Sequence, residues 1–324
     1  MKTIDELRSF FQSELMGQLE DLEIQRKVIV RRTTLSAVIA VGVLIVSFFI
    51  IMAANPEALP LMFFLAVLAG AAITGIVHFS SRGYVNDFKS RVIRAIVKWL
   101  DPSLSYDAQG YIPQDIYLDS EIFQRHPDRY RGDDLVRGRT GQTDVEFCEL
   151  HSEYKTEHRD SKGRRRTSWH TIFKGLFFSG DFNKHFSGRT IVLPDTTEKL
   201  FGKLAQTFQS WNFSREDLIK LEDPEFEKEF VVYGSDQVEA RYILSTSLMK
   251  RIVAFKRKSG RAVHLSFVRS RVFVAVSYRR TLFEPRLFKT LLDFEPIREY
   301  VEDLQLALGI VEDLNLNTRI WSKT

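Results

Sequence analysis

The chain has 324 residues, 44% of them hydrophobic, and a formal net charge of +4 at pH 7. This modest charge gives no indication of a nucleic-acid partner, and the hydrophobic content is enough for at least one large folded core. The single cysteine, Cys148, excludes an intrachain disulfide and any metal site built on paired cysteines, in agreement with a reducing compartment.

Residues 1–30 are predicted to form one amphipathic helix, because apolar residues recur at spacings of three and four between Ile4 and Ile29. Acidic residues occupy its other faces. They argue against contact with an anionic membrane surface, where Lys and Arg would be expected. We therefore expect this helix to pair with another helix of the same protein.

Two apolar runs follow, Leu35–Ala54 and Pro60–Phe79, and neither contains Asp, Glu, Lys or Arg. Each has about the 20 residues that a helix needs to cross a hydrocarbon core. The short connection allows only a tight turn, so we predict a transmembrane helical hairpin. A buried hairpin of a soluble protein is disfavoured because core helices normally keep a polar stripe. A signal peptide is disfavoured because the first run begins late and no small-residue cleavage site follows it.

The charges that flank the hairpin predict its orientation. Basic residues lie on the outer side of both runs, whereas the turn carries Glu57 and no basic residue. The positive-inside rule therefore places both termini in the cytosol, in a multi-pass protein of the bacterial inner (plasma) membrane. The residues expected to contact anionic headgroups of the inner leaflet are Arg26, Lys27, Arg31, Arg32 and Arg82.

Small residues of the second run, Ala66, Gly70 and Thr74, allow close approach of two helices in lipid. They either pack the two helices of one hairpin together or form a contact between copies in a homo-oligomer. The second run continues into a basic, amphipathic stalk helix over Tyr84–Leu100, which Asp101-Pro102 ends. It should pair with the acidic N-terminal helix as a short antiparallel coil, with an inter-chain coiled coil as the alternative.

The remainder of the chain is predicted to be α+β, with antiparallel strands and helices packed on one side or end. A connector at Ser103–Arg131 should hold one short strand and a helical turn at Ser120–Arg125. The predicted strands are a long hairpin of Thr143–Thr156 with Ser168–Gly180, then Gly188–Pro194, Phe226–Gly234, and a hairpin of Val263–Val268 with Val272–Ser277. The predicted helices are Glu198–Trp211, Asp236–Leu244, Ser247–Lys258 with Gly260 as C-cap, and Pro285–Leu314 with a kink near Pro296.

These elements divide the chain into four regions. We expect a cytosolic amphipathic helix at residues 1–34, the transmembrane hairpin at 35–79, a juxtamembrane stalk helix at 80–101 and a cytosolic α+β domain at 102–324. Whether the last region is one subdomain or two stays open.

Several sequence segments of the α+β region resemble those of an uncharacterised bacterial membrane-protein family with two transmembrane helices. They are Asp133-Asp134-Leu135-Val136-Arg137-Gly138, Ile172-Phe173-Lys174-Gly175-Leu176-Phe177-Phe178, Asp223-Pro224-Glu225-Phe226 and Val238-Glu239-Ala240-Arg241-Tyr242. The family is known as a domain of unknown function and also carries the label galanin. The resemblance extends from the hairpin almost to the C-terminus, and it implies no activity, cofactor or catalytic residue.

The sequence lacks a phosphate-binding Gly-rich loop, a dinucleotide fingerprint, His-Glu-x-x-His and Gly-x-Ser-x-Gly, so we expect no cofactor. His151 and Glu153 share one strand face, and His158 is nearby. Histidine and glutamate are residue types that bind metals. Alternating charges on a hairpin usually mark a solvated face instead, and we expect no metal.

Two turns are further candidates for function. The turn Asp181–His185 combines an acid, the amide of Asn183 and an imidazole, which makes it a candidate catalytic site. Turn geometry and internal hydrogen bonds also explain it. The basic turn carrying Arg164, Arg165 and Arg166 could contact phosphate headgroups or an acidic partner, or it could be a solvated loop tip.

Two classes of function remain. The first is an inner-membrane-anchored, cytosol-facing interaction module that binds a protein or lipid partner, and the absence of catalytic motifs favours it. The second is a membrane-bound enzyme that acts on lipids or phosphorylated substrates through the Asp181–His185 turn.

Overall fold

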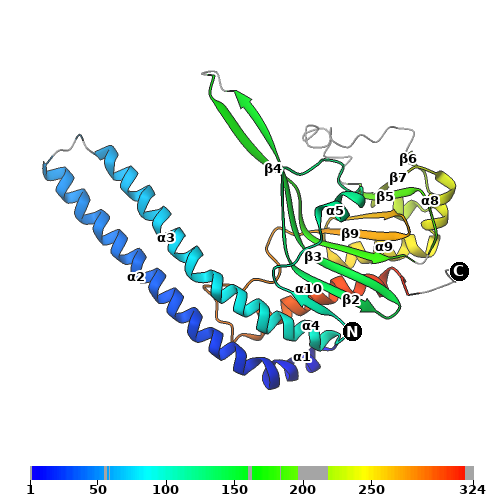
Figure 1. The fold of residues 1–324 in the computed structure, drawn as a ribbon, viewed down its shortest axis with the longest axis horizontal. Coiled ribbons are helices and arrows are strands. Elements are labelled where there is room, and N and C mark those ends of the chain that lie inside the picture. The colour runs from blue at the N-terminus through cyan, green and yellow to red at the C-terminus, as the bar shows by residue number, and fades with distance from the viewer. Residues whose placement is uncertain are drawn as a thin grey trace. The chain divides into compact units, whose positions relative to one another are not determined.

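The structure is a computed structural model that describes residues 2–54, 57, 59–159, 163–182, 184–195 and 218–317. It has long N-terminal helices and an antiparallel nine-stranded sheet with helices, which confirms the α+β class (Figure 1). Two compact units are present. We call residues 2–95 with 284–299 the helical unit, and the described parts of residues 96–283 and 300–317 the sheet unit.

The helical unit begins with α1 (Ile4–Phe10), the π-helical turn η1 (Phe11–Leu15) and α2 (Met16–Ala54). Thr3 starts α1 with a capping box, in which its N–H donates to the Glu6 carboxylate at 2.7 Å. One stripe of these helices is buried, with Leu15, Leu19 and Leu22 fully covered. The predicted amphipathic helix is confirmed, and it continues without a break into the first apolar run.

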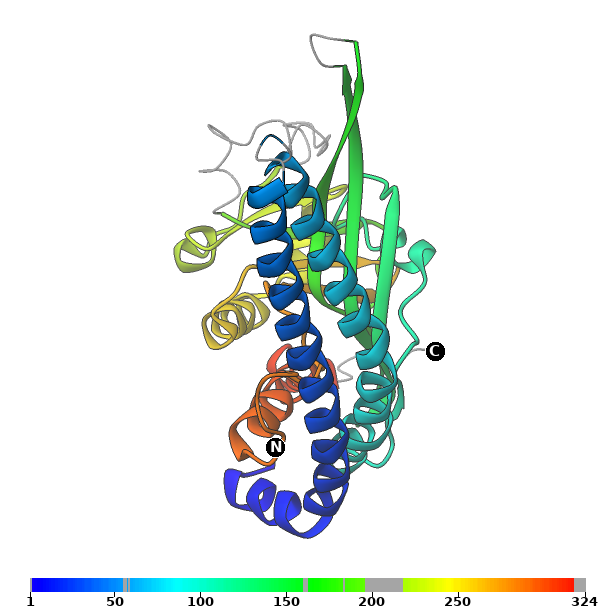
Figure 2. The same ribbon diagram turned by 90° about the vertical axis from the view of Figure 1, so that its left-hand side faces the viewer.

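Helix α3 (Leu59–Phe88) returns beside α2 and leads through the π-helical turn η3 (Lys89–Ile93) into α4 (Arg94–Leu100). Figures 1 and 2 show α2 and α3 side by side along the hairpin. Near its base, Arg91 of η3 donates to Asp21 of α2 at 3.1 Å. This contact confirms that the acidic and basic helices pair within one chain.

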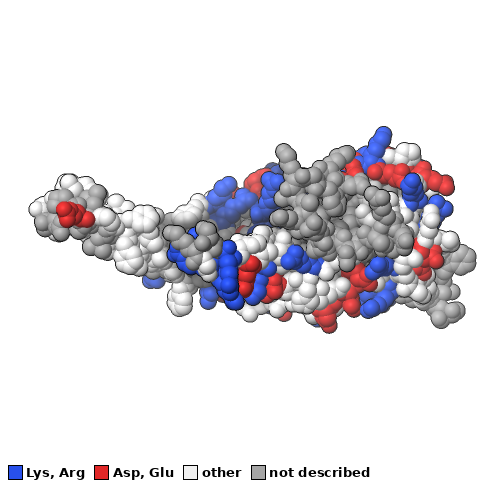
Figure 3. Space-filling model, turned by 90° about the horizontal axis from the view of Figure 1, so that it is seen from above, with Lys and Arg blue, Asp and Glu red and all other residues white. Residues whose placement is uncertain are grey.

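Two helices are long and apolar enough to cross a membrane, Ile4–Ala53 and Met62–Leu100, and their most apolar stretches are not buried by the protein. Large side chains such as Val43 and Phe63 are 59% and 76% exposed. In the face shown in Figure 3, the middle of the hairpin is free of charged side chains.

Residues 284–299 join the helical unit from far along the sequence. The Phe294 ring lies edge-on to Phe11 at 5.5 Å, and the Arg8 guanidinium lies over the same ring at 5.4 Å. The expected helix over Pro285–Leu314 is wrong in its first part, because α10 spans Phe294–Asp313. Pro296 therefore does not kink a helix but lies in the first turn, where its missing N–H costs nothing.

The sheet has the strand order β1-β2-β3-β4-β9-β8-β5-β7-β6, and all its neighbours are antiparallel. The strands are β1 (Ser105–Asp107), β2 (Arg129–Thr140), β3 (Thr143–Arg159), β4 (Arg165–Asp181), β5 (Arg189–Pro194), β6 (Leu218–Ile219), β7 (Phe230–Gly234), β8 (Val263–Val268) and β9 (Arg271–Ser277). The helices are α5 (Gln114–Asp119), α7 (Pro224–Glu227), α8 (Gln237–Ile243), α9 (Thr246–Ser259) and α10. Both predicted hairpins, β3–β4 and β8–β9, are confirmed.

The core lies on both faces of the central strands, since every residue of β8 is buried. On one face, Tyr117 and Phe123 from the α5 region pack against Phe177 of β4 and Phe273 of β9. Gly260 ends α9 in the left-handed conformation, with φ 62°, as predicted.

Two other predictions need correction. The helical turn of the connector is α5, which precedes Ser120–Arg125, because Glu121 has a left-handed φ of 53° that no α-helix continues through. The strand predicted over Phe226–Gly234 begins with the helical turn α7, because Asp223 accepts the N–H groups of Glu225 and Phe226 and so caps a helix. The helix predicted over Glu198–Trp211 lies outside the described residues.

Candidate functional site

The β3–β4 hairpin extends beyond the rest of the sheet as a two-stranded arm, here defined as residues 154–170 (Figure 1). Strand β2 pairs with β3 only as far as Glu153, and β9 pairs with β4 only from Gly175. The N–H of Lys155 still donates to Asp128 at 2.8 Å. Beyond it, among the described residues, the two outer edges of the arm have no neighbouring strand.

The base of the arm is held by rings and guanidinium groups. Tyr154 stacks on His170 at 4.9 Å, and the Arg125 guanidinium lies 3.5 Å from the Tyr154 ring centre. On the other strand, the Arg129 guanidinium lies 3.7 Å from the ring centre of Trp169. These cation–π contacts pack the base of the arm against the residues that precede and begin β2.

The arm is cationic. It contains six Lys or Arg residues and two acidic ones, a net charge of +4. Arg164, Arg165 and Arg166 are all exposed, and the Arg165 side chain is 73% exposed at 3.9 Å from Glu157. The predicted basic turn therefore lies at the end of a structured hairpin.

The candidate metal ligands on this hairpin do not form a three-residue cluster among the described residues. His151 Nε2 lies 3.8 Å from Glu153 Oε1, but Glu153 Oε2 also binds Arg129 at 3.2 Å. A bulge separates Ser152 from Glu153, and His158 lies further along the arm, opposite Arg166. Burial lowers the pKa of His151, which favours the neutral form of its imidazole.

A cluster of three carboxylates that the sequence did not indicate lies at the β2–β3 pairing. Oxygens of Asp133, Asp134 and Glu149 lie within 4.8 Å of one another. Tyr106 donates to Asp134, and the N–H of Leu282 donates to Glu149 at 2.7 Å. Hard oxygen ligands of this kind suit a divalent cation. Finding this cluster from the sequence would have required the cross-strand register, which places Asp133 opposite Glu149.

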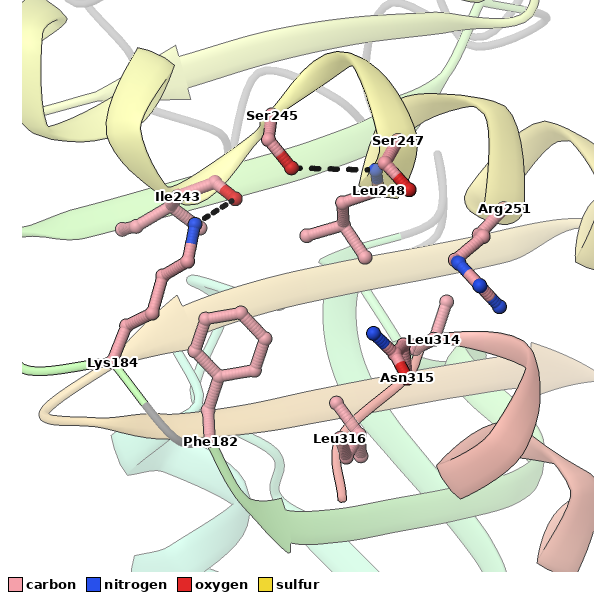
Figure 4. A pocket seen from close by; sticks show the side chains of 10 residues that line it. All are labelled: Phe182, Lys184, Ile243, Ser245, Ser247, Leu248, Arg251, Leu314, Asn315 and Leu316. Atoms are coloured by element: carbon pink, nitrogen blue, oxygen red, sulfur yellow. Dashed lines mark hydrogen bonds between the residues drawn. The ribbon is translucent and has the colours of Figure 1, made fainter. Parts of the chain in front are cut away.

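The candidate catalytic turn borders a cavity of about 150 Å³ in the sheet unit (Figure 4). Phe182 and Lys184 of the turn line this cavity, whereas Asp181 and His185 do not. His185 is exposed, and Asn183 lies outside the described residues. The structure therefore does not bring the proposed acid and imidazole together in the cavity.

The cations of the cavity are used to cap helices. Lys184 donates to the carbonyl oxygens of Tyr242 and Ile243 at 2.5 and 3.5 Å, at the end of α8. Arg251 donates to the Glu312 carbonyl at 3.3 Å, at the end of α10. Burial lowers the pKa of Lys184.

Ser245, which also lines the cavity, caps α9 by accepting the N–H of Leu248 at 3.4 Å, and Asn315 follows the end of α10 with φ 58°. The described lining residues include neither a histidine nor a carboxylate that could activate the Ser245 or Ser247 hydroxyl. Among the described residues, the lining of this small, partly apolar cavity thus contains no nucleophile–base pair.

The basic residues that flank the two apolar runs differ in their environment. Arg26 binds Glu23 in a bidentate pair at 2.7 and 2.8 Å and donates to the Leu287 carbonyl at 2.8 Å. Its side chain is only 12% exposed, so the expectation that Arg26 contacts lipid is corrected: it is bound within the protein. Lys27, Arg31, Arg32 and Arg82 are exposed.

Comparison with known proteins adds little to this geometry. No curated protein matches the sequence. One solved structure, the mycobacterial trehalose monomycolate transport factor A, TtfA, matches with 10% sequence identity over 69% of this chain and 96% of its own, at a TM-score of 0.31. A TM-score this low supports no conclusion about fold or function. A family model described as "Protein of unknown function (DUF3137)" matches residues 171–316, from β4 to the end of α10, so this chain contains a domain of unknown function.

Proposed function

We propose that this chain is an interaction module anchored in the bacterial inner membrane by α2 and α3, with both termini in the cytosol. The arm of residues 154–170 is its contact for an acidic protein partner. The observation that carries the proposal is the pair of long apolar helices whose side chains the protein leaves uncovered.

The anchor is supported by the cost of leaving these helices in water. Val46, Phe49 and Phe63 are 59%, 67% and 76% exposed. Exposed apolar surface costs about 25 cal/mol per Å² relative to a buried state, and soluble proteins rarely expose patches above a few hundred Å². A bilayer removes this cost, and the helical backbone satisfies its own hydrogen bonds there.

The arm suits a protein partner better than a lipid surface. Its unpaired strand edges offer N–H and C=O groups to an extended peptide, which can add as a further strand. Its net charge of +4 favours an acidic peptide. Lipid headgroups could use the charge but not the strand edges.

Photo-crosslinking in native membranes tests the contact. A crosslinking residue replaces Thr167, which is exposed on the arm. We expect crosslinks to a protein that disappear in the R164E/R165E/R166E variant while membrane association is retained. The matched control reverses three exposed cations outside the arm, in K228E/K250E/R279E. Crosslinks that persist in the arm variant, or that reach lipid alone, would overturn the proposal.

Orientation has a separate test. Alkaline phosphatase is fused into the turn of residues 55–59 or to the C-terminus. The proposal expects activity at the turn and none at the C-terminus, and the opposite pattern would reverse the orientation.

The enzyme alternative places the reaction at the Asp181–His185 turn. A lipid or phosphorylated substrate would have to meet Asp181 and His185 outside the neighbouring cavity, which neither residue lines. If the double variant D181A/H185A folds but loses the cellular phenotype, catalysis at this turn is favoured. A preserved phenotype favours the interaction module.

A further inference from the structure

The segment of residues 284–293, here called the juxtamembrane loop, exposes apolar side chains within the helical unit. Phe288 is 71% exposed and Leu292 is 37% exposed. Lys289, between them, is exposed too. Neighbouring apolar residues of the same segment, Pro285 and Leu291, are buried, so the exposure is selective.

The backbone of this loop is held against α2. Arg26 donates to the Leu287 carbonyl at 2.8 Å, and the N–H of Leu291 donates to Glu23 at 3.0 Å. Glu23 and Arg26 bind each other and are almost completely buried. These two bonds flank Phe288 on both sides, so its position along α2 is set by residues 23–26.

That position is close to the predicted membrane boundary. Arg32 is the last charged residue before the first apolar run, six residues after Arg26. At 1.5 Å per residue, Arg26 lies about 9 Å and Glu23 about 14 Å along the helix from Arg32. The polar interfacial layer of a bilayer is itself about 5–8 Å thick on each side. Phe288 thus lies within about one side-chain length of the headgroup layer.

We propose that Phe288 contacts the headgroup layer on the cytosolic side, as a membrane contact additional to the hairpin. The inference rests on the proposed membrane anchor. A bilayer is the favoured occupant because the loop is fixed to the helix that enters it. The exposed cations Lys27, Arg31 and Lys289 suit anionic headgroups, as in other interfacial segments.

Depth-dependent fluorescence quenching tests the proposal. The full-length protein is reconstituted into phosphatidylcholine–phosphatidylglycerol vesicles that contain nitroxide-labelled lipid, with an environment-sensitive label on Lys289→Cys. Cys148 is fully buried, and burial raises the pKa of its thiol, so it stays unlabelled. Val46→Cys in the apolar run and Val238→Cys on α8 serve as the inserted and aqueous references.

We expect quenching at positions 46 and 289 and none at 238. If position 46 is quenched but position 289, like position 238, is not, the loop contact alone is overturned. No quenching at position 46 overturns the membrane anchor itself. A second variant adds Phe288→Ser to the Lys289→Cys protein, and we expect loss of quenching at 289. Unchanged quenching in that variant shows that the Phe288 side chain makes no such contact.

Discussion

The apolar side chains of the helical hairpin and of the sheet are of the same types but lie in opposite surroundings. Val46 and Phe49 of α2 are 59% and 67% exposed, whereas Val274 and Phe177 of the sheet are fully buried. In the sheet, neighbouring strands pair along the edges, and side chains from distant parts of the sequence, such as those of the α5 region, pack on a face. In the hairpin, the described part of α2 packs along its apolar run against α3, and the most apolar stretch is left uncovered by the protein.

The largest expected effect comes from deleting a buried aromatic ring of the sheet, compared with deleting an exposed ring of the hairpin. Phe177→Ala should lower the free energy of unfolding of the sheet unit by about 3–5 kcal/mol, because it leaves a cavity among packed rings. Phe49→Ala should leave that free energy unchanged. Chemical denaturation in detergent, followed by near-UV circular dichroism, measures both. Equal destabilisation by the two variants would contradict the distinction between the regions.

The next effect concerns the charge pair that holds the juxtamembrane loop. Hydrogen bonds from Arg26 lower the pKa of Glu23 to about 2 from the ordinary 4.5. The group therefore contributes stability that is present above pH 4.5 and is lost as the pH falls towards 2, up to roughly 3 kcal/mol.

Hydrogen exchange of residues 284–293 should show this loss of protection below pH 4.5. In Glu23→Gln the loop should be less protected at pH 7 and its protection should no longer depend on pH in this range. Protection in the wild type that is constant from pH 5 to 3 would contradict the role of Glu23.

A smaller effect is expected at His264 in β8. Burial lowers its pKa to about 4, below the ordinary 6.5, so the unfolded chain binds a proton that the folded protein excludes. Stability should therefore decrease as the pH falls from 6.5 towards 4, by about 2 kcal/mol between pH 7 and pH 5. Thermal unfolding of the wild type and of His264→Gln measures this, and the variant should lose that part of the pH dependence. An identical pH dependence in both proteins would exclude His264 as the source.

The smallest expected effect tests whether the arm unfolds independently of the sheet. Trp169→Ala removes the ring under the Arg129 guanidinium, a contact worth about 0.5–1 kcal/mol at an exposed site. Hydrogen exchange in residues 154–170 should quicken accordingly, while the global unfolding transition stays unchanged. A shift of the global transition would show that the arm and the sheet unfold as one unit.

Elements with a local signal were predicted well from the sequence. Alternation and turn residues indicated the β3–β4 and β8–β9 hairpins, and Gly260 indicated the end of α9. Errors occurred where a local interaction favoured another type of element. The Asp223 side chain caps a helical turn, so the start of the predicted strand forms α7 instead. The candidate catalytic turn was located beside a cavity, but the side chains that line the cavity are Phe182 and Lys184 rather than Asp181 and His185.

The sequence alone determined the two uncharged runs, their flanking charges and the alternation of the strands, because each depends on residues close together in the chain. Tertiary structure decided which residues of similar chemistry have different environments. Arg26 is buried against Glu23 and Leu287 while Lys27 beside it is exposed, and Asp133 meets Glu149 across two strands. Such outcomes depend on contacts between residues far apart in sequence, and local composition carries no record of which distant groups will meet.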